Sequence, residues 1–163
     1  HPLRSLSRNR VQMIFSLKPT TFEASKAMKM HPIQREHSSG TRQMFESYFM
    51  TKGSTSMQRD TPVIVTSNAA MVRSILQDSK AIGYFSFGFL RPGLKALAID
   101  GVYPTRTNIQ SGKYSLKREL LLHTNASKSN PRVQAFFQFL SRKETREKIE
   151  ALGFLSVGKS TFN

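Results

Sequence analysis

Apolar positions in the first half of the chain alternate between helical and strand spacing. Met44, Phe45, Tyr48 and Phe49 recur at i, i+1, i+4 and i+5, which is one face of a helix. The short apolar run Val63–Val65, bounded by polar residues, indicates a strand. Together these patterns predict helices over Ser5–Phe15, Arg42–Met50 and Ala69–Gln77, and strands over Pro32–Glu36, Val63–Val65 and Ala81–Phe85. Strands that alternate with helices favour an α/β fold with a mixed, mostly parallel sheet flanked by helices.

The second half has a different pattern. It predicts strands over Leu94–Ile99 and Leu116–His123, separated by the polar connection Asp100–Lys113. Two helices follow, one starting at Asn130-Pro131 and one opened by the capping box Ser141–Glu144 and ending at Gly153. We expect residues 1–163 to form a single α/β domain, with a core over 1–93 and a strand pair and C-terminal helices over 94–163.

Charge is the strongest compositional feature. The chain of 163 residues has 25 Lys and Arg against 10 Asp and Glu, a net charge of +15, so its surface favours anionic partners. The basic residues, Arg42 and Arg73 among them, are spread along the chain without a block of five or six, so a nucleic-acid partner is not expected. The chain has no Cys, which excludes disulfides and thiolate sites, and no apolar run long enough for a membrane span.

The turn between the strand at Pro32–Glu36 and the next helix is the candidate anion site. Its residues Ser38, Ser39, Gly40 and Thr41 combine hydroxyl groups with a glycine that lets an oxyanion approach the backbone. Arg35, just before the turn, supplies a fork of donors, and the free N–H groups of the helix N-terminus add further ones. The alternative interpretation is an ordinary helix start, with Ser39 as the N-cap and Arg35 solvated.

Other motifs carry less information. Gly153–Ser160 matches the phosphate-loop pattern, but a helix precedes it, so we interpret Gly153 as that helix's C-cap. The aromatic stretch Lys80–Phe89 resembles an RNA-binding strand, but its aromatics fall on both faces, which favours core packing. Ser67 is interpreted as a helix cap. The four histidines are isolated, with only His37 beside the anion turn. No nucleophile–base pair or metal set can be assembled, so we expect neither an enzyme nor a cofactor.

The residues also resemble a known family. Arg35–Thr41, followed by a helix with Phe45, is similar to the R-x-(D/E)-G-S-G-T…F turn of phosphate-binding proteins, the receptors of ABC phosphate importers. The similarity continues in order over most of the chain, at Ser67-Asn68, Ala81–Tyr84, Leu94–Gly101, Pro104-Thr105, Asn108-Ile109, Gly112–Leu116 and Gly153-Phe154.

This resemblance implies one lobe of a type II periplasmic-binding-protein-like fold, in which two lobes close on phosphate. The chain corresponds to the second lobe plus the C-terminal part, with most of the first lobe missing. By position, Arg35, Ser39, Gly40 and Thr41 match the family's phosphate contacts. His37 stands where the family often has a carboxylate. Ser38 stands where the family usually has Gly, and a backbone with positive φ at this position would be strained for a Ser.

The resemblance further implies binding of phosphate or a similar oxyanion, an extracytoplasmic (periplasmic) location and the membrane subunits of an ABC importer as partners. Apolar surface left by the missing first lobe would favour a homodimer. The alternative is a degenerate lobe that binds no solute and serves as a basic interaction or scaffold module.

Overall fold

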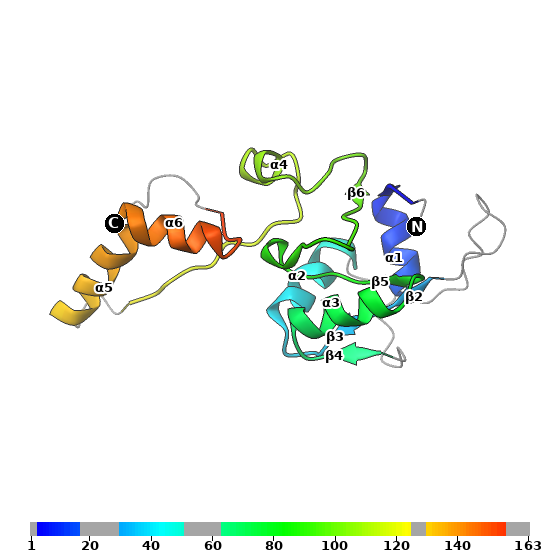
Figure 1. Cartoon of the computed structure of the whole chain (residues 1–163), viewed down its shortest axis with the longest axis horizontal. Coiled ribbons are helices and arrows are strands. Elements are labelled where there is room, and N and C mark those ends of the chain that lie inside the picture. Colours follow the sequence, from blue (N-terminus) through cyan, green and yellow to red (C-terminus); the bar gives the residue numbers. More distant parts are fainter. Residues whose placement is uncertain (1–2, 17–29, 51–62, 125–129, 156–163) are drawn as a thin grey trace. The chain divides into compact units, whose positions relative to one another are not determined.

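The computed structural model describes residues 3–16, 30–50, 63–124 and 130–155. The chain forms two compact units, residues 1–117 (unit 1) and residues 118–163 (unit 2), and each is described by itself. Most of the elements labelled in Figure 1 belong to unit 1, and only α5 and α6 belong to unit 2. Within the described ranges, no helix has the length and apolar character needed to cross a membrane.

Unit 1 contains short strands and mostly longer helices. The strands are β1 (Ser5–Leu6), β2 (His31–Pro32), β3 (Gln34–Arg35), β4 (Ile64–Val65), β5 (Ala81–Ile82) and β6 (Ala98–Ile99). The helices are α1 (Arg8–Phe15), α2 (Gly40–Phe49), α3 (Asn68–Gln77), the 3₁₀ turn η1 (Phe87–Phe89) and α4 (Arg106–Gln110).

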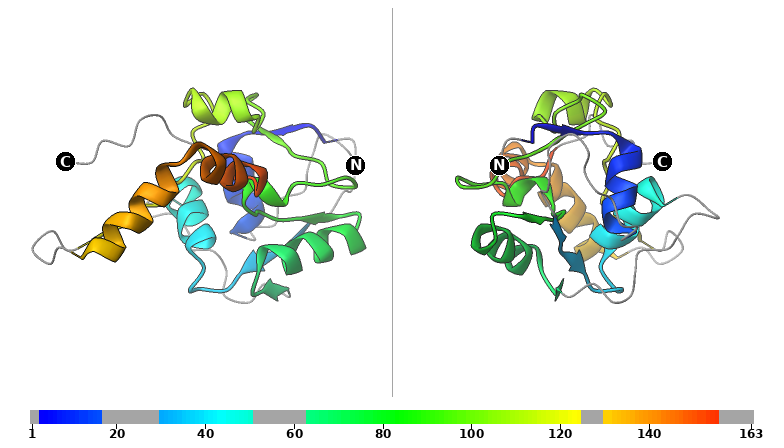
Figure 2. Two further views of the ribbon diagram at one scale, coloured as in Figure 1. Left: turned by 60° about the vertical axis from the view of Figure 1, so that its left-hand side comes forward. Right: turned by 90° about the vertical axis from the view of Figure 1, so that its right-hand side faces the viewer.

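All strand pairs are parallel: β1 with β6, β2 with β5, and β3 with β4. The stretch around Ile33 lies between two neighbours, because Ile33 donates its backbone N–H to Ile82 and Gln34 donates its own to Val63. In the right-hand view of Figure 2, α1 and α2 lie on one side of these strands and α3 on the other. Unit 1 is therefore a layered α/β structure, as the sequence pattern predicts.

Two apolar clusters hold the layers together. The larger one joins α1, α2 and the segment after β5, and its buried members are Leu6, Val11, Ile14, Phe15, Phe45, Phe49 and Tyr84. The rings of Phe45 and Tyr84 stack with their centroids 4.1 Å apart. The smaller cluster, Ile33, Val65 and Met71, packs α3 on the opposite face. Burying each such side chain stabilises the fold by about 1.5–3 kcal/mol.

Several predicted boundaries in unit 1 are wrong. The first helix starts at Arg8 rather than Ser5, because Ser5–Leu6 pairs with Ala98–Ile99 as a strand. Only the last two residues of the predicted strand Leu94–Ile99 are paired. The connection Asp100–Lys113 contains the unpredicted helix α4, whose N-cap is Thr105. Strand pairing over long sequence separations fixes these boundaries, and it is not visible in local periodicity.

Unit 2 contains α5 (Pro131–Ser141) and α6 (Lys143–Ala151). Asn130 caps α5 with Pro131 at its first position, which confirms that prediction. The predicted capping box is wrong: Ser141 is the last residue of α5, and Arg142 precedes α6 without a side-chain cap. The C-cap interpretation of Gly153 is confirmed by its φ of 89° and by bonds from Gly153 N–H to Glu150 O (2.9 Å) and from Phe154 N–H to Ile149 O (3.3 Å). The rest of the phosphate-loop match, from Ser156 on, lies outside the described residues.

The predicted strand Leu116–His123 is also wrong. No strand is formed there, and its backbone from Arg118 to His123 makes no hydrogen bond to another described residue. Leu120, Leu121 and Leu122 are exposed. A strand needs a neighbour for its ladder, and the described part of the chain supplies none here.

Candidate functional site

The candidate site lies where β3 and β4 end. Arg35, the last residue of β3, pairs with Val65, the last residue of β4, so the carboxyl ends of both strands meet at one edge. Ser39 starts α2 four residues after Arg35, and Ser67 starts α3 two residues after Val65. Two helix N-termini therefore follow the same sheet edge, and in α/β folds this is the edge where ligands bind.

The turn itself leaves two backbone donors free. The Ser39 N–H donates to Glu36 O (3.1 Å), and the Ser39 Oγ accepts from the Arg42 N–H (3.3 Å) as the N-cap of α2. The N–H groups of Gly40 and Thr41 have no acceptor among the described residues. The free N–H groups that the helix N-terminus was expected to offer are thus those of Gly40 and Thr41, because the Ser39 amide closes the turn.

Capping by Ser39 confirms one part of the alternative interpretation. It does not exclude a ligand contact, because a hydroxyl that accepts one hydrogen bond can still donate its own proton. Ser38 and His37 are exposed at the rim of the turn. The predicted strain at Ser38 is absent, since Asp100 is the one non-glycine residue with positive φ in the described chain.

Arg35 is buried, with 8% of its surface exposed, so the expectation of a solvated Arg35 is wrong. Its Nε and Nη2 donate to the two carboxylate oxygens of Glu36, both at 2.9 Å. Nη1 donates to Asn68 Oδ1 (2.9 Å), and Nη2 also reaches the Thr66 carbonyl oxygen (3.4 Å). These contacts fix the guanidinium between the starts of α2 and α3 and occupy four of its five N–H groups.

The position of the Glu36 side chain depends on where β3 ends. Strand alternation predicts that its side chain points away from Arg35. Because β3 ends at Arg35, alternation stops there and the carboxylate turns back to the guanidinium. Hydrogen bonding from Arg35 lowers the pKa of Glu36, so this carboxylate is ionised at neutral pH. The carboxylate next to Arg35 thus comes from Glu36, one residue before His37, which stands where the family often has a carboxylate.

Arg42 is a site residue that sequence reasoning missed, because it was counted among the spread surface charges. Its side chain is among the largest fully buried ones in the described chain. Nη1 donates to the Arg35 carbonyl oxygen (2.7 Å), and Nε donates to Glu46 Oε1 (2.9 Å). Glu46 at i+4 was a signal for an ion pair, but not for burial. Arg42 holds the end of β3 against the first turn of α2.

Two further residues complete the support around Arg35. Asn68, which accepts from Arg35, donates through Nδ2 to Ser86 Oγ (3.1 Å). The Tyr84 hydroxyl accepts from the Arg35 N–H (3.2 Å), and burial raises the pKa of Tyr84 to about 12. Ser67 caps α3, as predicted, through the Ala70 N–H. The role of Asn68 gave no separate signal in the sequence.

The arrangement favours an anion over a cation. Free amides at a helix N-terminus and two guanidinium groups contribute positive potential, while Glu36 offsets part of it. The described residues contain no group of three or more His, Asp or Glu side chains that would hold a metal ion. These groups can donate hydrogen bonds to a bound anion.

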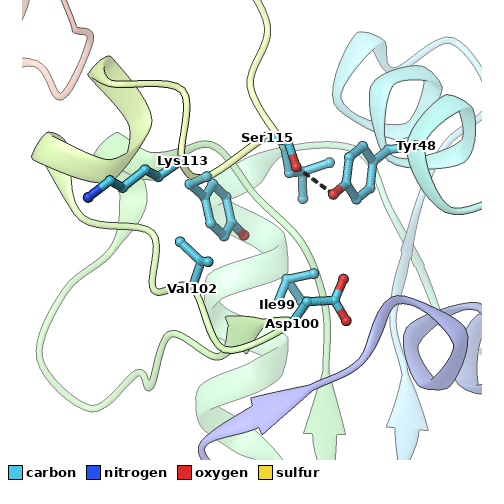
Figure 3. A pocket seen from close by; sticks show the side chains of 8 residues that line it. Tyr48, Ile99, Asp100, Val102, Lys113 and Ser115 are labelled. Atoms are coloured by element: carbon cyan, nitrogen blue, oxygen red, sulfur yellow. Dashed lines mark hydrogen bonds between the residues drawn. The ribbon is translucent and has the colours of Figure 1, made fainter.

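A separate cavity of about 80 Å³ lies near the other end of α2. Figure 3 shows Tyr48 donating to or accepting from Ser115 across it, at 2.6 Å. Asp100 lies on its wall in a tight turn with Gly101, both at positive φ, and accepts from the Arg8 N–H. None of the predicted site residues lines this cavity.

Comparison with known proteins gives consistent results, although no family model matches. The chain is 27% identical to a phosphate-binding protein PstS of Borreliella burgdorferi over 137 residues, covering 79% of this chain and 49% of that protein. It is 32% identical to PstS 2 of Streptococcus pneumoniae serotype 4 over 136 residues, covering 79% of this chain and 46% of the relative. The chain thus spans about half the length of the curated relatives it matches.

Solved structures agree. An ABC-type phosphate transport receptor from Vibrio cholerae superposes with a TM-score of 0.79 at 27% identity, covering 95% of this chain and 65% of that one. A Clostridium perfringens substrate-binding protein, at 21% identity, has the same fold with a TM-score of 0.81 over 96% of this chain and 64% of its own. The predicted fold class, an α/β lobe of the periplasmic-binding-protein type, is confirmed.

Proposed function

We propose that this chain, which is related over most of its length to the phosphate-binding proteins of ABC importers, binds phosphate or a similar tetrahedral oxyanion without enzymatic turnover. One observation carries the proposal. The buried guanidinium of Arg35 lies at the carboxyl end of β3, next to a helix start whose Gly40 and Thr41 amides have no acceptor among the described residues. No comparison supports the alternative of a scaffold module.

Each candidate residue has a defined part. The amides of Gly40 and Thr41 donate to one face of the anion, and the hydroxyls of Ser39 and Thr41 donate beside them. Arg35 contributes its charge and the one guanidinium N–H that has no acceptor among the described residues. Ser38 and His37 form the exposed rim.

The affinity of the chain alone is expected to be low. In the described residues the anion is contacted from one side only, so water still reaches it and weakens each electrostatic contact. We expect a dissociation constant in the millimolar range, which corresponds to about 4 kcal/mol.

Partners and location are proposed on the same basis. The related receptors act in ABC transport, so we propose the membrane subunits of such an importer as partners and an extracytoplasmic location. The match covers 65% of the Vibrio cholerae receptor, and we propose that this lobe acts together with a first lobe equivalent to the remainder of that fold. The alternative partner is a second copy of the chain, in a homodimer formed through apolar surface.

Calorimetric titration of the full chain tests the proposal. Phosphate is expected to bind with a millimolar dissociation constant, and Arg35→Gln is expected to weaken binding at least tenfold, because it removes the charge at the sheet edge. Arg73→Gln is the control, since Arg73 is an exposed arginine on α3 and its loss changes the net charge equally. Equal weakening by both variants would show that general surface charge attracts phosphate, and the site assignment would be wrong.

A further inference from the structure

The main chain of Arg35 is held by two side chains instead of by a second neighbouring strand. On the β4 side of β3, Glu36 donates its backbone N–H to Val65 O (3.2 Å). On the other side, the last ladder bond runs from Ile33 N–H to Ile82 O (2.8 Å), and β5 ends at this residue. The N–H and C=O of Arg35 face this second side, beyond the end of β5, and buried backbone groups need partners.

Tyr84 and Arg42 supply these partners. The Tyr84 hydroxyl accepts from the Arg35 N–H (3.2 Å), and Arg42 Nη1 donates to the Arg35 carbonyl oxygen (2.7 Å). Both side chains are buried and are themselves fixed, because the Tyr84 ring stacks on Phe45 and Arg42 Nε donates to Glu46 Oε1. We call Arg42 and Tyr84 the Arg35 clamp, since together they bind both backbone groups of that residue.

Arg42 also connects the two groups of donors at the candidate site. It lies in the first turn of α2, and its own backbone N–H donates to Ser39 Oγ (3.3 Å). Its main chain is therefore fixed to the turn that carries the Gly40 and Thr41 amides, while its side chain is fixed to Arg35. An anion gains most from both groups when they are aligned before it binds, because ordering them on binding costs free energy.

Packing alone does not explain an arginine at position 42. A buried cation loses its hydration, and this loss often exceeds what an ion pair returns. An apolar side chain of similar volume would fill the same space without that cost. A donor at this position is needed to satisfy the carbonyl oxygen of Arg35, and this need ties the buried charge to the candidate site.

We propose that Arg42 and Tyr84 are positioning residues for anion binding, which hold the Arg35 main chain so that its guanidinium and the Gly40 and Thr41 amides face one anion. This inference rests on the proposed function, because it assigns roles at the same site. With only 1% of its surface exposed, Arg42 acts through Arg35 and the turn rather than by contact with the anion. Loss of either clamp side chain is expected to weaken phosphate binding and to loosen the end of β3.

The test combines calorimetric phosphate titration with amide hydrogen exchange of the full chain in the absence of phosphate. Arg42→Met is expected to raise the dissociation constant about tenfold and to speed exchange of the Arg35 amide about tenfold. Arg42→Lys keeps the charge and one donor, so it is expected to restore both quantities to within about threefold. Phe49→Leu is the control: it changes a buried side chain at the other end of α2 and should lower stability without altering either quantity.

Tyr84→Phe keeps the ring and removes only the hydroxyl, so it provides the test if Arg42→Met does not fold. It is expected to weaken phosphate binding and to speed exchange of the Arg35 amide, while the Ile33 amide exchanges as before. Unchanged phosphate binding in the clamp variants, or equal weakening by Phe49→Leu, would overturn the proposal. Absence of phosphate binding by the unmodified chain would overturn the proposed function, whereas an Arg35 amide that exchanges equally fast in the clamp variants and in the unmodified chain would overturn the clamp itself.

Discussion

At the residue scale, Gln34 is a polar side chain buried inside the core. It is fully buried, and neither its Oε1 nor its Nε2 has a hydrogen-bond partner among the described residues. A buried amide left unpaired costs about 1–3 kcal/mol. Its neighbour Arg35, buried on the same strand, has four contacts instead. Burial is therefore tolerated at Arg35 through pairing and at Gln34 only at a cost in stability.

Gln34→Met is accordingly expected to stabilise unit 1. The thioether fills a similar volume without an unpaired polar group, so the free energy of unfolding should rise by about 1 kcal/mol or more. Urea unfolding measures the change, and Gln43→Met at an exposed position of α2 is the control, expected to change it by less than about 0.5 kcal/mol. A lower unfolding midpoint for Gln34→Met would contradict the assignment of an unpaired amide.

At the element scale, the start of α2 has both a structural and a proposed binding role. Ser39→Ala removes the N-cap, which should lower the free energy of unfolding by about 1 kcal/mol. It should also weaken phosphate binding, because a hydroxyl donor is lost beside the Gly40 and Thr41 amides. Ser7→Ala removes the cap of α1 and is the control: it should cost similar stability and leave phosphate binding unchanged. Unfolding and calorimetric titrations on both variants separate the two effects.

The helix and strand boundaries also show how much of the fold could be predicted from the sequence. Helix starts at Ser39, Ser67 and Asn130 follow local rules, and the structure confirms these residues as caps. Strand ends do not follow local rules, because a strand exists only where a distant segment pairs with it. The apolar run at Leu116–His123 therefore predicted a strand that the described chain does not form.

The site was predictable only in part for the same reason. The sequence predicted that Arg35 and the turn Ser38–Thr41 lie together, and they are neighbours in the structure. It did not predict the burial of Arg42 or the return of Glu36 to Arg35, because both follow from where β3 ends and how α2 packs on it. The binding roles of Arg35, His37, Ser38, Ser39, Gly40 and Thr41 stay predictions.

At the scale of the whole molecule, stability should depend on pH in the alkaline range. Burial raises the pKa values of Tyr84 and Tyr114 to about 12, against a usual value of 10. Their phenols ionise in the unfolded chain first, so their contribution to stability is complete below pH 10 and decreases as the pH rises from 10 to 12.

Two measurements check this prediction. Absorbance titration should show late ionisation of two tyrosines, one of which disappears in Tyr84→Phe. Urea unfolding at pH 9, 10 and 11 should show decreasing stability above pH 10. Tyrosine titration complete near pH 10 in the folded protein would contradict the burial of these two hydroxyls.

The central claim is that a tetrahedral anion binds at the start of α2, and amide NMR during a phosphate titration tests it most directly. We predict that the Gly40 and Thr41 amide signals move furthest and follow one millimolar binding curve, while the Ser39 amide, already bonded to Glu36, moves less. Shifts spread over the basic surface, with Gly40 and Thr41 unchanged at saturating phosphate, would contradict the account.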